Sequence, residues 1–207
     1  MNSDTVFRDG FPEEFESTVR RVSSLFGDPL YKSRSGDEVA LVSNTTIKLP
    51  DRIYVAEPPS ELLLSLDAVE EGVARCLLAR HHDGFVRQRQ IADLVRLSEP
   101  WSVPYVLALL GEYVLEIHQS LVETLVPALE DDEPTKHVYS QLLRANPKWW
   151  SLIQNRVVSY WAAYHRFKYA MERTEVGRRI PDAYPAARVA RSLGNVDEVP
   201  RLIKPLR

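Results

Sequence analysis

Apolar positions near the start of the chain recur with the spacing of a helix. One face would carry Phe11, Phe15, Val19, Val22 and Phe26, at steps of three and four. Pro12 falls in the first turn, where a missing N–H is tolerated, and Gly27 follows as a C-cap. We therefore expect a helix over residues 11–26.

Residues 38–55 carry β-branched residues in short runs instead. Strands are expected at residues 38–42 and 45–49, and a third at residues 52–55. The pairs Ser43-Asn44 and Pro50-Asp51 supply turn residues between them. The pattern predicts a small antiparallel β meander near residues 38–56, which needs a covering layer to be stable.

From residue 61 to residue 179 the pattern is helical again. A helix over residues 67–80 carries Val73, Cys76 and Leu77 on one face, and Asp83 is expected to cap the helix that follows. A long apolar helix is expected over residues 103–129, with Ser102 as its N-cap, and its apolar faces place it at the centre of the core. An acidic loop at residues 130–133 and a short helix over residues 134–145 come next.

The last long helix is expected to begin at Pro147 and to carry an aromatic seam. The seam comprises Trp150, Ile153, Val157, Tyr160, Tyr164, Phe167 and Met171. This heptad spacing is typical of one face of a helical bundle, and it also fits an interface with another chain. Pro185 to Leu193 reads as a short helix with Gly194 as its C-cap.

Together these elements predict a mainly α protein, either a multi-helix bundle or a short helical array, with a small antiparallel β meander. Residues 1–180 of the 207-residue chain are expected to form a single mostly helical domain, followed by a tail. That tail, residues 181–207, is basic and dotted with prolines, and its apolar residues leave open that it packs back onto the body.

Residues 67–97 resemble a HEAT-type helical repeat. Asp83, Val86, Arg87 and Leu94 match the layout of such repeats, in which the Asp caps the second helix and the Arg bridges to neighbouring repeats. The resemblance implies a helical array, although a solenoid needs about three repeats and one copy is visible. Residues 81–117 also resemble uncharacterised bacterial proteins, which implies no function.

Charge is divided unevenly along the chain. The net charge of −3 conceals a value of −12 for residues 1–133 and of +9 for residues 134–207. Such asymmetry is typical of a surface for nucleic acid or for an acidic partner, and it also fits a basic end that contacts the acidic end of its own chain or of a second copy.

Several functional classes find no support in the sequence. The longest apolar runs are about five residues, whereas a membrane helix needs about twenty, so no membrane contact is expected. The N-terminus lacks the pattern of a secretory signal, and the expected compartment is a reducing cytosol. Serine hydrolase, phosphate-loop and dinucleotide motifs are absent, and no cofactor is expected. Cys76 lies on an apolar face, which favours a small buried residue over a nucleophile.

One group of residues has the chemistry of a metal site. The candidate ligands are His81, His82, Asp83, Glu112 and Glu116. Imidazole and carboxylate groups suit zinc or iron, so a metal-dependent enzyme with a site near His82 and Glu112 is one alternative. The competing interpretation is a helix cap flanked by exposed histidines, with the two glutamates on a polar helix face.

The basic C-terminal third supplies the other candidate surface. Its residues are Arg166, Lys168, Arg173, Arg178, Arg179, Arg188 and Arg191. Tyr164 and Phe167 lie among them and are able to stack on single-stranded bases, although their place in the aromatic seam predicts core packing. The sequence favours a non-enzymatic adaptor or assembly component that binds another protein or a second copy of itself, with nucleic-acid binding as the alternative.

Overall fold

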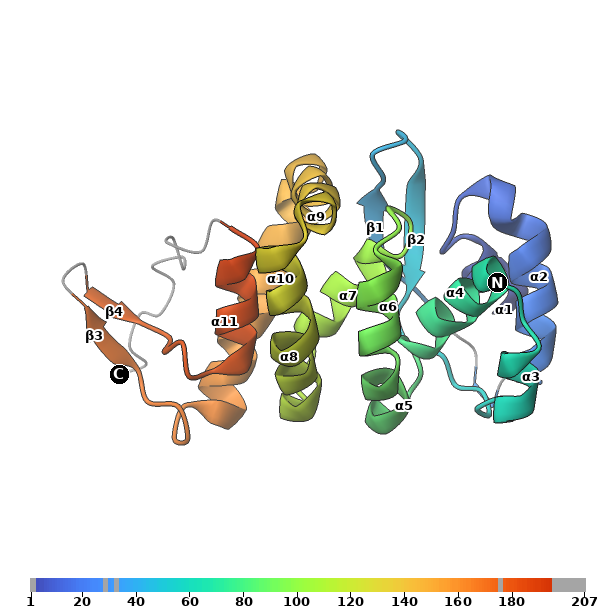
Figure 1. Ribbon diagram of the computed structural model, residues 1–207. Coiled ribbons are helices and arrows are strands. Elements are labelled where there is room, and N and C mark those ends of the chain that lie inside the picture. Colours follow the sequence, from blue (N-terminus) through green and yellow to red (C-terminus); the bar gives the residue numbers. More distant parts are fainter. Residues whose placement is uncertain (1–2, 28–29, 32–33, 175–176, 195–207) are drawn as a thin grey trace.

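The computed structural model describes residues 3–27, 30–31, 34–174 and 177–194, and helices dominate it (Figure 1). The N-terminal part contains α1 (Ser3–Arg8), α2 (Glu16–Ser23), β1 (Ser35–Ala40), β2 (Thr46–Pro50), α3 (Ser60–Leu64) and α4 (Ala68–Leu78). The middle contains α5 (Gly84–Arg89), α6 (Ile91–Leu97), α7 (Val103–Leu110), α8 (Leu115–Asp131) and α9 (Glu133–Ala145). α10 (Pro147–Tyr160), β3 (Glu172–Thr174), β4 (Gly177–Arg179) and α11 (Pro185–Ser192) follow. The prediction of a mainly α fold with a small antiparallel sheet is confirmed.

The elements form an elongated row with the N-terminal helices at one end and the β3–β4 hairpin at the other (Figure 1). One hydrophobic core runs from Phe7 and Phe11 to Ala190 and Leu193. α4 packs on α2, α6 on α8, and α8 on α11. Within the described residues, no helix is long and apolar enough to cross a membrane.

The first predicted helix is shorter than expected. α2 is flanked by 3-10 turns at Glu13–Phe15 and Ser24–Phe26, so the expected helix over residues 11–26 is divided into three pieces. Its apolar face is nevertheless buried at Phe11, Val19, Val22 and Phe26. Gly27 ends the segment with a φ of 65°, a conformation that glycine adopts without strain.

The meander contains two strands instead of three. β1 and β2 pair antiparallel, with Val39 opposite Ile47 and both side chains fully buried. The expected third strand does not pair with β2. Ile53 instead pairs with the backbone just past α4: its N–H donates to the Arg80 carbonyl, and its carbonyl accepts from the His82 N–H. Asn146 closes part of the free edge of β1, since its side chain both donates to and accepts from the Ala40 backbone at 2.7 and 2.8 Å.

The helix after α4 begins as predicted. Asp67 caps α4 in a capping box with Glu70, and Asp83 caps α5 by accepting the Phe85 N–H at 2.8 Å. The helix expected after Asp83 is interrupted at Gln90, which separates α5 from α6.

The predicted helix over residues 103–129 is wrong as one element. α7 ends at Leu110, Gly111 follows as its C-cap, and Val114 is extended before α8 begins. Ser102 makes no side-chain cap, because its hydroxyl donates to the Glu99 carbonyl. Further on, α8 continues through Pro127 to Asp131, so the expected acidic loop is instead the end of α8 and the cap residue of α9, Asp132.

The last long helix also ends early. α10 stops at Tyr160 and passes into a π-helical turn, Trp161–His165. Trp150, Ile153 and Val157 are buried, whereas Tyr164 and Phe167 are 65% and 86% exposed. The aromatic seam therefore belongs to the core in its first half and to the surface in its second.

The segment from residue 181 to residue 194 lies in the body of the protein. α11 packs on α8, and Ala186, Val189 and Ala190 are buried in the common core. The short helix predicted at residues 185–193 forms, and Gly194 follows it with a φ of 79°. The expected tail thus does not begin at residue 181, and its residues 195–207 lie outside the described part of the chain.

Candidate functional site

The break between α7 and α8 places Glu112 among three arginines. The Glu112 carboxylate contacts the Arg52 guanidinium, and lies 3.5 Å from Arg80 Nη1 and 3.6 Å from Arg87 Nη2. Its side chain is 3% exposed, and those of Arg80 and Arg87 are 9% and 3% exposed. A buried carboxylate is tolerated only when it is paired, and the three guanidinium groups supply that pairing.

The arginines also hold the surrounding backbone. Arg80, just past the end of α4, donates to the carbonyls of Pro50 and Asp51 at 2.8 and 2.7 Å. Arg87, on α5, donates to the carbonyls of His81 and His82 at 2.7 and 2.9 Å. The cluster of Glu112 with these arginines therefore joins the end of β2, the α4–α5 loop and the α7–α8 break.

Positive charge in this cluster exceeds negative charge. Burial, together with the charge of Arg52, lowers the pKa of Arg80 to about 10, and Glu112 acts in the opposite direction. Burial likewise lowers the pKa of Arg87, again opposed by Glu112. Desolvation disfavours the charged form of a basic group, and the carboxylates of Glu112 and Asp51 oppose this effect on Arg80.

A pocket of about 210 Å³ opens beside the cluster. Its walls include Asp37 from β1, Arg52, Arg80, Tyr113 in the α7–α8 break, and Arg156 and Tyr160 from α10. Arg156 donates to both oxygens of Asp37, at 2.9 and 3.3 Å, and the Trp149 indole donates to the same carboxylate at 3.1 Å. We call this cavity the arginine pocket.

Tyr113 and Tyr160 line the arginine pocket, and the ring of Tyr164 lies beside both of them. The ring of Tyr113 lies 6.1 Å from that of Tyr160 and 6.0 Å from that of Tyr164, and the last two are 6.2 Å apart. Tyr113 is 55% exposed, and the His165 ring donates to its carbonyl at 3.1 Å. We call Tyr113, Tyr160 and Tyr164 the tyrosine cluster.

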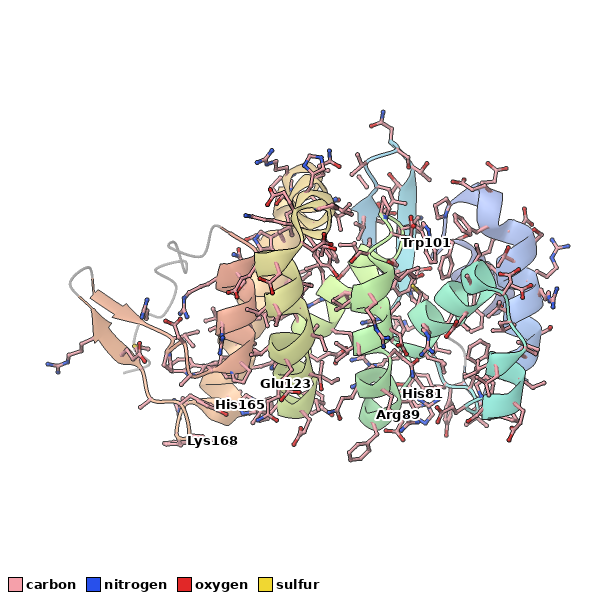
Figure 2. All side chains as sticks on the ribbon, in the orientation of Figure 1. His81, Arg89, Trp101, Glu123, His165 and Lys168 are labelled. Atoms are coloured by element: carbon pink, nitrogen blue, oxygen red, sulfur yellow. The ribbon has the colours of Figure 1, made fainter. Side chains whose placement is uncertain are left out.

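Basic residues predicted as a surface divide into two sets. Arg166 and Lys168 are exposed and lie over neighbouring rings, Arg166 at 4.9 Å from the Phe167 centroid and Lys168 at 5.4 Å from that of Tyr169. Figure 2 shows His165 and Lys168 at the same end of the molecule, in the segment after α10. These two cations adjoin the tyrosine cluster along the chain.

The other basic residues are arranged differently from the prediction. Arg173 is exposed on β3 and pairs in register with Arg178 on β4, so it does not share a helix face with Arg166. Arg179 is engaged by Glu172 and Asp182, and Arg191 by Asp182. Arg188 is exposed on α11.

The predicted metal ligands are not brought together. Both ring nitrogens of His81 are used, because Nε2 donates to the Val55 carbonyl and Nδ1 accepts the Asp83 N–H. His82 stacks on Tyr54 at 5.3 Å, Asp83 caps α5, and Glu116 is exposed. Glu112 is held by arginines, and within the described ranges no group of three or more candidate ligands is found.

A second buried polar group lies near His165. His118, on α8, is fully buried, and its ring lies 5.9 Å from that of Tyr184 in an edge-to-face arrangement. Burial lowers the pKa of His118 to about 4, and the charge of His165 acts in the same direction. Elsewhere in the core, burial raises the pKa of the Cys76 thiol well above its ordinary value, which makes it a poor nucleophile.

Sequence reasoning missed most of the site. Arg52, Arg80, Arg156 and Asp37 come from four segments, and no local spacing joins them. Only the position of Glu112 and Tyr113 could have been recognised as a break from the sequence, because Gly111 and the charged Glu112 interrupt an otherwise apolar helical run.

Comparison of the chain with protein-family models, curated proteins and solved structures finds no match. The resemblance of residues 67–97 to a HEAT-type repeat therefore stays a prediction.

Proposed function

We propose that the protein is a non-enzymatic adaptor or assembly component that docks an acidic segment of another protein on the tyrosine cluster. The observation that carries this proposal is the mutual contact of Tyr113 and Tyr164 while both stay more than half exposed. Adjacent exposed rings of this size are typical of interaction surfaces.

The composition of the surface fits a protein interface. Tyrosine and arginine are enriched among the residues that contribute most to protein–protein affinity, and their rings and guanidinium groups bury large areas with few rotatable bonds. Here the tyrosine cluster is flanked along the chain by Phe167, which is 86% exposed. These rings supply the apolar contact that a partner would cover.

Charge indicates the nature of the partner. Arg166 and Lys168 are exposed, and neither makes an ion pair with a described residue. Complementary charge steers association and selects among partners. An acidic segment that also offers an apolar side chain is the occupant we propose.

The test is recovery of the partner by purified, tagged protein, with two matched variants. Tyr164→Ala removes a ring of the tyrosine cluster, while Phe85→Ala removes a ring that is 71% exposed on α5. Truncating an interface anchor costs about 2 kcal/mol or more, which is roughly a thirtyfold loss of affinity. We expect one protein to be recovered by the wild type and by Phe85→Ala and lost with Tyr164→Ala; equal recovery by both variants would contradict the proposal.

Binding of single-stranded nucleic acid is the second candidate. The observation that favours it is Arg166 over the exposed Phe167 ring, because alternating cations and accessible rings are what stack on and neutralise such strands. Its signature is recovery that collapses with nuclease and an affinity that falls steeply with salt. A second copy of the chain as partner would appear instead as a concentration-dependent dimer in sedimentation.

A further inference from the structure

The tyrosine cluster adjoins a second group of rings, which is partly or fully buried. Tyr184, the residue before α11, is fully buried, and its ring lies 5.4 Å from that of His165 and 5.6 Å from that of Tyr169. The fully buried ring of His118, on α8, meets the Tyr184 ring edge to face at 5.9 Å. We call His118, His165, Tyr169 and Tyr184 the histidine cluster. It joins α8 to the start of α11 and to the segment that follows α10.

His165 connects the histidine cluster to the tyrosine cluster. Its Nε2 donates to the Tyr113 carbonyl at 3.1 Å, and its ring lies 6.3 Å from that of Tyr164. His165 is also the last residue of the π-helical turn Trp161–His165, and such turns are frequent at functional sites. A displacement of His165 therefore changes the spacing of the two exposed rings, Tyr113 and Tyr164.

His118 is buried without a partner for its ring nitrogens. Neither nitrogen makes a well-formed hydrogen bond to a described residue. Burial lowers the pKa of His118 to about 4, and the charge of His165 acts in the same direction. The carbonyls of Leu110 and Glu112 and the Glu112 carboxylate act in the opposite direction, but they do not outweigh burial. The closed protein therefore holds His118 as a neutral imidazole at pH 7.

The groups around His118 offer no free counter-charge for a proton. Of the charged groups that act on its pKa, His165 disfavours the proton, and Glu112 is already paired with three arginines. Burial raises the pKa of Tyr184 well above its ordinary value, so that hydroxyl stays neutral. A protonated His118 is therefore favoured only where its ring reaches water.

The ring of His118 reaches water when its contact with Tyr184 opens, because α11 packs on α8 here. In an open state the pKa of His118 returns to about 6.5, against about 4 in the closed state. These two values predict that the ratio of open to closed molecules rises about twentyfold between pH 7 and pH 5. Acid therefore favours the separation of the start of α11 from α8.

From the contacts of the histidine cluster and its bond to Tyr113, we propose that His118 is an acid-sensitive latch of the tyrosine cluster. A proton from the solvent binds a ring nitrogen of His118, the start of α11 separates from α8, and His165 loses the Tyr184 ring on which it packs. The rings of Tyr113 and Tyr164 are then no longer held together, so a partner docked at neutral pH is released in acid. The release rests on the proposed docking function, whereas the opening is a property of the protein alone.

Hydrogen–deuterium exchange of the purified full chain measures the opening. Protection factors at pH 7 and pH 5, each corrected for the intrinsic exchange rate at that pH, are compared for the wild type and two matched variants. His118→Leu removes the titrating group, and His137→Leu removes an exposed histidine on α9. We expect the protection of α11 to fall about twentyfold in the wild type and in His137→Leu, and by less than about threefold in His118→Leu.

Three results would overturn the opening. The first is protection of α11 that does not change with pH in the wild type, and the second is an equal fall in His118→Leu. The third is equal protection of α11 and α7 at pH 5, because α11 would then be released only by global unfolding. If His118→Leu does not fold, His118→Gln carries the comparison, since an amide takes up no proton in this range.

Recovery of the partner by the tagged protein tests the release. A partner bound at pH 7 should be lost from the wild type at pH 5 and retained by His118→Leu. Retention by the wild type at pH 5 contradicts the latch and leaves the docking function intact. Recovery of no partner at pH 7 contradicts the docking function and the release with it, whereas the exchange experiment still decides the opening.

Discussion

Replacing Glu112 with glutamine isolates the role of the buried carboxylate. The substitution keeps the size of the side chain and one acceptor oxygen, removes the charge and turns the other oxygen into an NH2 donor. Arg80 and Arg87, whose side chains are less than one-tenth exposed, would then face each other without a counter-charge. Arg52 is more accessible to water, so the loss of its contact matters less.

The magnitude follows from burial. Removing one partner of a buried ion pair costs about 3–5 kcal/mol, because the remaining charge is left uncompensated. The glutamine carbonyl still accepts a hydrogen bond, so we expect a loss near the lower limit, about 3 kcal/mol. With a urea dependence of about 2 kcal/mol per molar, the unfolding midpoint would fall by about 1.5 M.

Equilibrium unfolding in urea, followed by tryptophan fluorescence, measures this loss. Glu123→Gln is the matched control, because Glu123 is exposed on α8 (Figure 2) and its replacement should change stability by less than about 0.5 kcal/mol. If Glu112→Gln and Glu123→Gln unfold at the same urea concentration, the carboxylate does not hold the arginines as described, and the reasoning fails.

Two further predictions concern buried polar groups. The pKa of His118 is lowered to about 4 in the folded protein, so its contribution to stability is fully present above about pH 6.5 and is lost as the pH falls towards 4. In urea unfolding, the wild type should therefore lose about 2 kcal/mol more than His118→Leu between pH 7 and pH 5. Equal losses by the two proteins would refute the assignment. Tyr105→Phe should cost about 1–3 kcal/mol of stability, because the Tyr105 hydroxyl donates to the Gly10 carbonyl at 2.8 Å. Tyr139→Phe should be close to neutral, because the buried Tyr139 hydroxyl bonds to no described residue. Thermal melts in which Tyr139→Phe is the less stable of the two variants would contradict this prediction.

Sequence signals correctly predicted the helix ends that depend on neighbouring residues alone. Asp83, which caps α5, and Gly194, which follows α11, mark element ends, because a cap involves only neighbouring residues. The first half of the aromatic seam was also correctly read as a buried face, since Ile153 and Val157 repeat at helical spacing.

The predicted helix boundaries were wrong where contacts between residues far apart in the sequence accompany the change in backbone conformation. The apolar spacing over residues 103–129 favours one helix, but α7 stops at Leu110, and the break after it places Glu112 against arginines 25 to 60 positions earlier in the chain. The end of α10 is a similar case: Tyr164 and Phe167 keep the heptad spacing of a core face, but α10 ends before them, and both side chains are exposed in the described part of the chain. For the same reason the arginine pocket lay beyond sequence reasoning, because its walls meet only in the folded protein.

The most direct test of the account places a photo-activated crosslinker at position 164 and, in a second protein, at position 85. Both positions hold exposed aromatic side chains, and only the first belongs to the tyrosine cluster. Irradiation in the cells that make the protein, followed by mass spectrometry, should join one acidic protein to position 164 and not to position 85. Crosslinks to the same proteins from both positions, or crosslinks from position 164 to nucleic acid alone, would contradict the claim that the tyrosine cluster docks a protein.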